Sequence, residues 1–389
     1  MQTYEKNYYD LVTSGLGSLT KLQGYLDNVL AMKYNMLQLD GFTMASGMQP
    51  DFSYEQIQKE LDINVMASYV DLDSDPVPFA AKGFSLSTGK IPRMKARLEL
   101  DEDDIRKQLI IQQRFGNSSD RAMNAAKDAL WNTTDTLIGS HTNSLTYQRH
   151  QMVSRGELKL LDTNNPRGLK NVAFGANVPD ANKTILTANA RWWTDAAYKT
   201  EGTTSNPIQD MKDQVEKAED KGLTAMHFEI DKAFAKKVIS HSKVNAAIAA
   251  NLFPMATDQT AVANAAANLS FERKIEILSS IVGAPFKVID SVVAIEKYNT
   301  ATKKIERPQQ RAFAPDVLVL VPDGNLGEVL TVEPIKLPLN NGTYADFYGG
   351  RLLMTVDYDI MKKIQYYQTE MTSLVVPSVP QMMFYLNIK

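Results

Sequence analysis

The longest regular pattern of apolar and polar positions runs from Ser119 to Arg155. Its apolar residues recur at helical intervals and form a stripe of Met123, Leu130, Leu137, Ile138, Leu145 and Met152. Asp120 suits the positive start of a helix, and Gly156 directly after a basic residue suits its end. We therefore predict one helix on the order of 50 Å long, which exceeds the roughly 30 Å diameter of a small domain.

The middle of this helix needs support from outside. Residues 132–144 are rich in Asn, Thr, Ser and Gly, which are poor helix formers. Propensity alone does not hold such a helix together, so its apolar stripe should lie on a sheet or on neighbouring elements. The residues expected to make that packing contact are Met123, Leu130, Leu137, Leu145 and Met152.

The chain before this helix has weaker patterns. Residues 1–60 contain short amphipathic pieces at Leu19–Leu30 and Tyr54–Leu61, which we interpret as helical turns in an extended arm that orders against other parts or other chains. An ordinary N-terminal subdomain is the alternative. Phe79–Leu100 alternates loosely, broken by Gly83 and Ser87–Gly89, which favours two strands around a polar tip, and a helix is expected from Ile105 to Arg114.

Such a two-stranded ribbon buries little apolar surface of its own. We therefore predict that it projects and lies on something else, as a loop used in assembly. Its basic residues are Lys82, Lys90, Arg93, Lys95 and Arg97.

The chain after the long helix reads as an α/β lobe of about residues 206–345 and a C-terminal part. A strand pair, Glu157–Asp162 with Leu169–Phe174, precedes the lobe. The lobe contains a helix opened by Asn206-Pro207 and ended at Gly222, helices at Asp231–Ser240, Asn245–Leu252 and Ala261–Leu278, and strands at Phe286–Ile289, Val292–Tyr298 and Val317–Val321. The apolar end at Met382–Leu386 should be tied into a sheet.

Composition narrows the class of protein. A chain of 389 residues predicts two or three lobes, and no apolar run approaches the roughly 20 residues that span a bilayer. The first residues lack the basic start and apolar core of a secretory signal, so we expect no export by that route. The absence of cysteine excludes disulfides and thiolate chemistry, and a net charge of −3 provides no general field for nucleic acid.

The sequence patterns typical of catalytic, cofactor-binding and metal-binding sites do not match this chain. No phosphate-binding loop, dinucleotide fingerprint or nucleophile elbow is present, and the four histidines show no metal-ligand spacing. Asp71–Pro76 resembles half of a calcium loop, but Pro76 replaces its glycine and Lys82 its glutamate. The acids of Asp101–Asp104 fit a helix cap better than a catalytic pair, and packing is favoured over a ligand platform for Trp192-Trp193.

Several segments, taken in this order, resemble a known family. They are Gly156–Leu160 after the long helix, Trp193 followed by Asn206–Asp210 and Gly222, Val317–Val321 followed by Pro322–Gly327, and Val376–Pro380 before an apolar strand. Over roughly residues 60–389 the chain is similar to the HK97-type fold of tailed-phage major capsid proteins, and more narrowly to the lambda-type major capsid protein E family.

This resemblance implies an α+β fold with five parts. They are an N-terminal arm (1–62), a strand and E-loop region (63–112), a P-domain with the long spine helix (113–205), an A-domain (206–345) and a C-terminal return to the P-domain (346–389).

The resemblance also implies a structural protein without catalytic or cofactor sites. Copies would form hexamers and pentamers of an icosahedral shell around double-stranded DNA, with scaffold, portal and decoration proteins as partners, in a virion assembled in the host cytoplasm. An encapsulin-like nanocompartment shell protein and a two-lobed enzyme with a site between its lobes are the alternatives.

Overall fold

The computed structural model describes residues 39–59, 84–100, 103, 120–176, 178–195, 197–252, 268–299, 302–338, 343–359 and 364–388. They form two compact units. The first is built from the described parts of Met1–Tyr54, Lys90–Thr146 and Val329–Val375, and the second from those of Glu55–Gly89, Tyr147–Glu328 and Val376–Lys389. The expected pieces at Leu19–Leu30 and Ile105–Arg114 lie outside the described residues.

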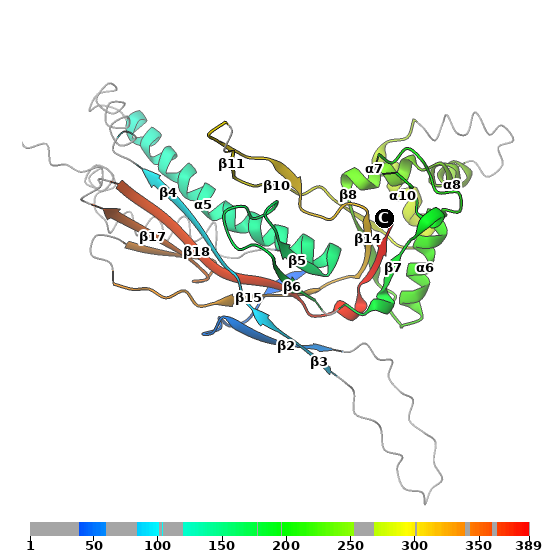
Figure 1. Ribbon diagram of the computed structural model, residues 1–389, viewed down its shortest axis with the longest axis horizontal. Coiled ribbons are helices and arrows are strands. Elements are labelled where there is room, and N and C mark those ends of the chain that lie inside the picture. The colour runs from blue at the N-terminus through cyan, green and yellow to red at the C-terminus, as the bar shows by residue number, and fades with distance from the viewer. Residues whose placement is uncertain are drawn as a thin grey trace, which may run out of the picture. The chain divides into compact units, whose positions relative to one another are not determined.

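A six-stranded sheet is the framework of the first unit (Figure 1). Its strands are β1 (Phe42–Met44), β4 (Arg93–Leu100), β15 (Gly327–Val332), β16 (Thr343–Phe347), β17 (Leu352–Asp359) and β18 (Ile364–Pro377). They are ordered β1-β15-β18-β17-β16, and β4 also pairs with β18. Gln365 of β18 is therefore flanked by Tyr358 of β17 and Leu100 of β4. The buried apolar residues of this sheet include Leu352, Met354 and Leu374.

The predicted ribbon of two paired strands is wrong. β3 (Phe84–Lys90) pairs with β2 (Ser53–Lys59), whereas β4 pairs with β18. The connection Ile91-Pro92 is not a tight-turn sequence, and a residue before proline favours extended backbone, so the chain runs on instead of folding back. Pairing with β2 also draws Ser87–Gly89 into β3 and makes Tyr54–Lys59 a strand instead of a helical turn.

The long helix is confirmed as α5 (Asp120–Arg155), with 36 residues. At about 1.5 Å per residue it is roughly 54 Å long. It ends at Gly156, whose φ of 70° lies in the left-handed region that favours glycine. A Cβ at this position would lie 2.9 Å from Cγ2 of Val178, so the helix end also needs glycine for space.

A five-stranded mixed sheet with four helices makes up most of the second unit. Its strands are ordered β7 (Lys183–Ile185), β19 (Phe384–Asn387), β14 (Val317–Pro322), β8 (Met226–Asp231) and β9 (Phe286–Ile289). β7 is parallel to β19 and β9 to β8, and the other neighbours are antiparallel. The helices are α6 (Pro207–Glu219), α7 (Lys232–Ser240), α8 (Ser242–Leu252) and α10 (Phe271–Val282).

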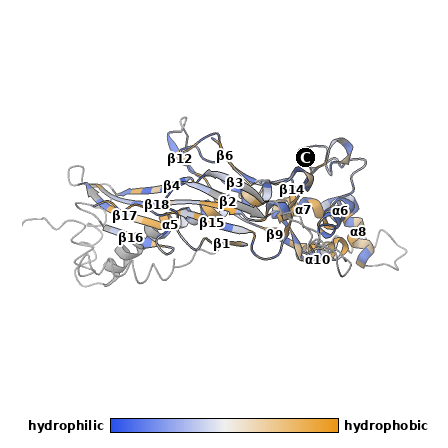
Figure 2. Ribbon diagram, turned by 90° about the horizontal axis from the view of Figure 1, so that it is seen from below, coloured by the Kyte–Doolittle hydropathy of each residue, from blue (hydrophilic) through white to orange (hydrophobic). Residues whose placement is uncertain are grey.

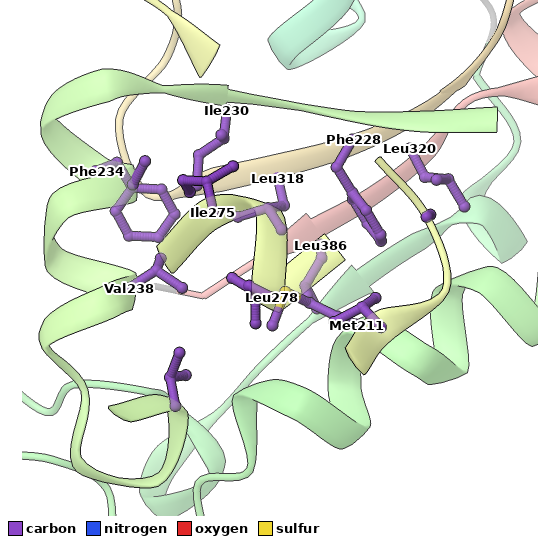
Figure 3. Close-up of a cluster of buried hydrophobic side chains, with 14 of the residues drawn as sticks. Met211, Phe228, Ile230, Phe234, Val238, Ile275, Leu278, Leu318, Leu320 and Leu386 are labelled. Atoms are coloured by element: carbon purple, nitrogen blue, oxygen red, sulfur yellow. The ribbon is translucent and has the colours of Figure 1, made fainter. Parts of the chain in front are cut away.

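The core of this unit lies between the sheet and the helices. Figure 3 shows side chains of β8, β14 and β19 meeting those of α6, α7 and α10, among them Phe228, Leu318 and Leu278. Figure 2 shows the matching apolar stretches on α7 and α10. Trp192 packs here too, with its ring stacked on Phe234 at 6.3 Å between centroids, so the packing interpretation of the tryptophan pair is confirmed.

The second unit also contains most of the β2–β3 pair and several smaller elements. The smaller elements are β5 (Glu157–Leu160) paired with β6 (Val172–Gly175), β10 (Val292–Ala294) with β13 (Gln309–Arg311), β11 (Lys297–Asn299) with β12 (Lys304–Glu306), and the short 3-10 helices Asp180–Asn182, Ala188–Ala190 and Pro380–Met382. The predicted strand pair after the long helix is thereby confirmed.

Two expectations about the lobe need correction, and a third is confirmed. Of the helix expected at Ala261–Leu278, residues 261–267 lie outside the described residues, and α10 begins only at Phe271, where Ser270 accepts a hydrogen bond from the amide of Arg273 and caps the helix. The single strand expected at Val292–Tyr298 is split between two ribbons, β10–β13 and β11–β12. The C-terminal strand is tied into a sheet as expected: β19 pairs with β14 of the lobe and with β7, which lies within residues 113–205 of the predicted P-domain.

Candidate assembly surfaces

Three of the predicted assembly residues form a basic row on β4. Arg93, Lys95 and Arg97 are exposed and alternate with less exposed residues, so they share one face of the strand. Both Nε of Arg93 and Nζ of Lys95 reach the carboxylate of Glu370 on β18, at 3.1 and 2.9 Å. The row therefore lies in a sheet instead of a projecting ribbon, and two of its charges are paired within the first unit.

Arg97 is held differently. Its guanidinium lies 3.8 Å from the ring centroid of Tyr366 and 3.0 Å from the carboxylate of Glu99. Lys90 is exposed at the end of β3, and Lys82 lies outside the described residues. Because exposed ion pairs contribute only about 1 kcal/mol or less, these contacts leave the cations able to exchange partners when another surface approaches.

Within the first unit, α5 packs through an apolar stripe and neutral hydrogen bonds. Leu137 and Leu145 are buried as predicted, and Ile138 lies fully buried beside them. Nε2 of His141 lies 2.9 Å from the hydroxyl of Thr369 on β18, and Thr142 lies 2.9 Å from the hydroxyl of Tyr348. The side chains of Met123 and Leu130 are outside the described residues.

The side chain of His141 is buried, and only one of its two ring nitrogens has a hydrogen-bond partner among the described residues. Its Nδ1 has no hydrogen-bond partner in the described part of the chain. Burial lowers the pKa of His141 to about 4, against the opposing effects of Thr369 and the charge of Glu370. The imidazole is therefore neutral in the fold at neutral pH, and protonation conflicts with its site.

Within the second unit, the end of α5 carries a buried ion pair. Met152 is buried as predicted, and the guanidinium of Arg149 contacts both carboxylate oxygens of Glu229 on β8, at 2.6 and 2.5 Å. Both partners are at most 1% exposed. Such a two-pronged contact satisfies both charges and fixes the orientation of the guanidinium.

Further cations surround Glu229. Nε2 of His227 and Nζ of Lys287 each lie 3.7 Å from its carboxylate, too far for a hydrogen bond but close enough for ion pairing. Burial alone would raise the pKa of Glu229, but His227, Arg149 and Lys287 together lower it to about 2. The carboxylates of Glu229 and Asp323 raise the pKa of His227. Glu229 is therefore ionised at neutral pH.

This pair is not identified from the sequence. One signal could have found it. Arg149 follows Leu145 by four residues and precedes Met152 by three, so it lies on the apolar stripe. A charge on that stripe predicts a buried partner, although the sequence does not say which acid supplies it.

The described residues contain no group of three His, Asp or Glu side chains arranged to hold a metal ion. Across those same residues, every helix is too short or too polar to cross a bilayer. Three of the histidines, His141, His150 and His241, are buried, and His227 takes part in the Glu229 cluster. The described histidines therefore take part in packing and in ion pairs.

The comparisons with known proteins give a family. A sequence model described as "Phage major capsid protein E" matches residues 22–371, which is most of the chain. The chain belongs to the phage major capsid protein E family. No curated protein sequence matches it.

Solved phage structures are similar over nearly their full length. A prophage capsid protein of E. coli CFT073 is 13% identical, with 95% of this chain and 98% of that chain covered and a TM-score of 0.48. A phage-related protein of Bordetella bronchiseptica RB50 is 10% identical (97% and 96% covered, TM-score 0.43), and the mature capsid of bacteriophage PhiM1 is 8% identical (91% and 87% covered, TM-score 0.42). Since these TM-scores lie below 0.5, the assignment rests on the family match.

Membership of the capsid protein E family confirms the predicted α+β structural protein of a tailed phage, which is not an enzyme. The family match begins at residue 22 and so includes part of the expected N-terminal arm, where the resemblance was weakest. It ends at residue 371, before the quoted segment Val376–Pro380. The assembly role of the basic row stays a prediction.

Proposed function

We propose that copies of this chain assemble as hexamers and pentamers into an icosahedral shell that encloses double-stranded DNA. The observation that carries this proposal is the family match over residues 22–371. The net charge of −3 supports it, because a near-neutral wall encloses DNA without holding it by counterion release. The shell is the capsid of a virion that assembles in the host cytoplasm.

The domain layout follows the family's plan in modified form. We assign residues 1–62 to the N-terminal arm, 63–112 to the E-loop region, 113–205 to the P-domain with α5 as its spine helix, 206–345 to the A-domain and 346–389 to the C-terminal return. The pairing of β7 with β19, and of β19 with β14, supports adding residues 183–185 and 384–387 to the A-domain sheet. The pairing of β2 with β3 supports a base for the E-loop there.

The partners in this proposal are other copies of the chain, a scaffold protein, a portal and a decoration protein. DNA is enclosed without recognition of its sequence. None of these roles requires a cofactor or a catalytic residue.

Negative-stain microscopy and sedimentation of the purified protein test the proposal. We expect closed shells or capsomer rings, with or without a co-expressed scaffold protein. A single monomer boundary at high concentration, unchanged across salt concentrations and with scaffold supplied, contradicts the proposal. Shells that enclose a protein cargo and exclude DNA during infection point instead to the nanocompartment alternative.

A further inference from the structure

The segment Glu333–Pro338, between β15 and β16, presents two large apolar side chains to solvent. Ile335 is 74% and Leu337 67% exposed, the two highest values among the large apolar residues that the structure describes. Single exposed apolar residues are common on protein surfaces, whereas adjacent ones this prominent mark an interaction site. We call Ile335 and Leu337 the peg.

The peg is held in place by its own unit. Lys336, between the two peg residues, forms an ion pair with Asp346 of β16, and the hydroxyl of Tyr344 donates a hydrogen bond of 2.5 Å to the carbonyl of Leu337. Pro334 and Pro338 flank the segment and restrict its backbone. Because the two prolines lack the N–H that strand pairing needs, they interrupt the hydrogen-bonding edge of the segment and favour contacts through the peg side chains.

A groove lies in the second unit. It borders β7, the edge strand of the five-stranded sheet (Figure 1). It encloses about 400 Å³, and its apolar wall includes Ile185, Pro315 and Val317. Ile185 of β7 is 61% exposed. An apolar residue on an uncovered edge strand is a liability unless something covers it, and pockets of about 300–1,000 Å³ accept small apolar groups.

Each of the two surfaces carries one exposed charge without an ion-pair partner among the described residues. The other charged side chains of the groove wall, Glu157, Lys183 and Asp316, contact Lys159, Asp180 and Tyr198. Glu333, at the start of the peg segment, is exposed and forms no ion pair with another described residue. Arg155, on the wall of the groove, is likewise exposed and without an ion-pair partner in the described part of the chain. A carboxylate beside the peg and a guanidinium beside the groove favour this match over a like-charged one.

We infer that the peg of one copy docks in the β7 groove of a second copy, with Glu333 beside Arg155. The inference rests on the proposed function, because a shell subunit buries surface against other copies. Peg and groove are different surfaces, so the contact is heterologous, and each copy gives a peg and receives one. Contacts of this kind close into rings when the rotation between copies permits.

Cysteine crosslinking tests the docking directly, because the chain has no cysteine of its own. Leu337→Cys and Ile185→Cys are made as separate variants, mixed during assembly and oxidised. We expect a disulfide-linked dimer on a non-reducing gel, since only close Cα atoms, within about 7 Å, can be bridged. The control mixes Leu337→Cys with Ile305→Cys, which lies at another exposed apolar position, 56% exposed, and should give no dimer.

The outcomes separate the inference from the proposed function. Shells that form without a 337–185 crosslink overturn the docking and leave the capsid function standing. A variant that carries both cysteines, Leu337→Cys and Ile185→Cys, is made as well. If it forms the disulfide within one chain while the mixture of single variants gives no dimer, the docking is also overturned. Failure of the unaltered protein to assemble at all overturns both.

Charge reversal supplies a second test that needs no crosslink. Arg155→Glu and Glu333→Arg should each raise the concentration needed for assembly by about threefold or more, and the double variant should return it toward the original value. Replacing both peg residues by Ser should raise it by at least about tenfold, whereas Leu169→Ser should not. Assembly of the peg variant at the unaltered concentration would falsify the inference.

Discussion

Two stretches of α5 are packed against the rest of the chain in different ways. Between Leu137 and Thr146, in the first unit, four positions are buried and the rest are partly or fully exposed. Between Gln148 and Ser154, in the second unit, every residue is buried. The first stretch is an amphipathic helix with one covered face, and the second is enclosed on all sides.

The polar chemistry differs accordingly. The first stretch uses neutral groups: His141 and Thr142 each form a hydrogen bond with a residue outside α5, Thr369 and Tyr348 respectively. The second stretch is cross-linked to several strands and loops: Arg149 contacts Glu229, Gln151 donates to the carbonyl of Ala312 at 2.6 Å, and Ser154 accepts from the amide of Ala314 at 3.1 Å. Complete burial requires every polar group to be paired, so the second stretch should tolerate less change.

The largest effect is expected from Arg149→Met. Removing the guanidinium leaves the carboxylate of Glu229 buried with only distant cations, which should lower the free energy of unfolding by about 3–5 kcal/mol. Denaturant unfolding measures this loss. Unfolding at the unaltered denaturant concentration would show that the pair contributes nothing to the fold.

The control for this change is the double variant Arg149→Met, Glu229→Met. Replacing both charges by apolar groups of similar length removes the desolvation cost as well as the attraction, so most of the lost stability should return. If the double variant is as unstable as the sum of the two single variants, the charges do not act as a pair.

Leu137→Lys tests the first stretch. Leu137 is only 7% exposed, and an ammonium group placed there lacks a partner, so we expect a loss of about 2–4 kcal/mol. Asn143→Ala on the exposed face of the same stretch is the matched control and should change stability by at most about 0.5 kcal/mol. Equal stability of the two variants would mean that the face of α5 is assigned wrongly.

The third prediction concerns pH. The pKa of His141 is about 4 in the fold and 6.5 in the unfolded chain, so the unfolded chain binds a proton first as the pH falls. Stability from the neutral imidazole is full above pH 6.5 and declines toward pH 4, by up to about 3 kcal/mol.

The difference between the unaltered protein and His141→Gln isolates this effect, because other groups titrate in both. Glu229, with a pKa of about 2, loses its contribution only below its unfolded value of 4.5, so the two windows barely overlap. Parallel stability curves of the two proteins between pH 7 and 4.5 would contradict the prediction.

Features that depend on neighbouring residues could be predicted from the sequence. The bounds of α5 and α7 follow from local signals, such as Gly156 at the end of α5 and Asp231 before α7, whose side chain accepts hydrogen bonds from the amides of Ala233 and Phe234. These signals lie within a few residues of what they determine. The apolar stripe of α5 was predictable for the same reason.

Pairings between distant residues were not predictable. β4 pairs with β18 more than 250 residues later, and nothing near Arg93 indicates that partner. Arg149 and Glu229 are 80 residues apart, so the burial of the arginine depends on a contact that no local pattern contains. The exposure of Ile335 and Leu337 was not predictable either. Large apolar residues are expected in the core, but these two lie on the surface, whereas Arg149 is a charged residue that lies inside.

The smallest effect is expected from Glu370→Gln on the basic row. The Glu370 carboxylate serves both Arg93 and Lys95, but those cations are 43% and 46% exposed, so water already screens much of the attraction. We expect a loss of at most about 1 kcal/mol that shrinks as salt is added. Glu99→Gln, at a carboxylate that is 53% exposed beside Arg97, is the control and should change less. A loss as large as that of Arg149→Met would show that the row is as enclosed as the end of α5, and the contrast between the two units would fail.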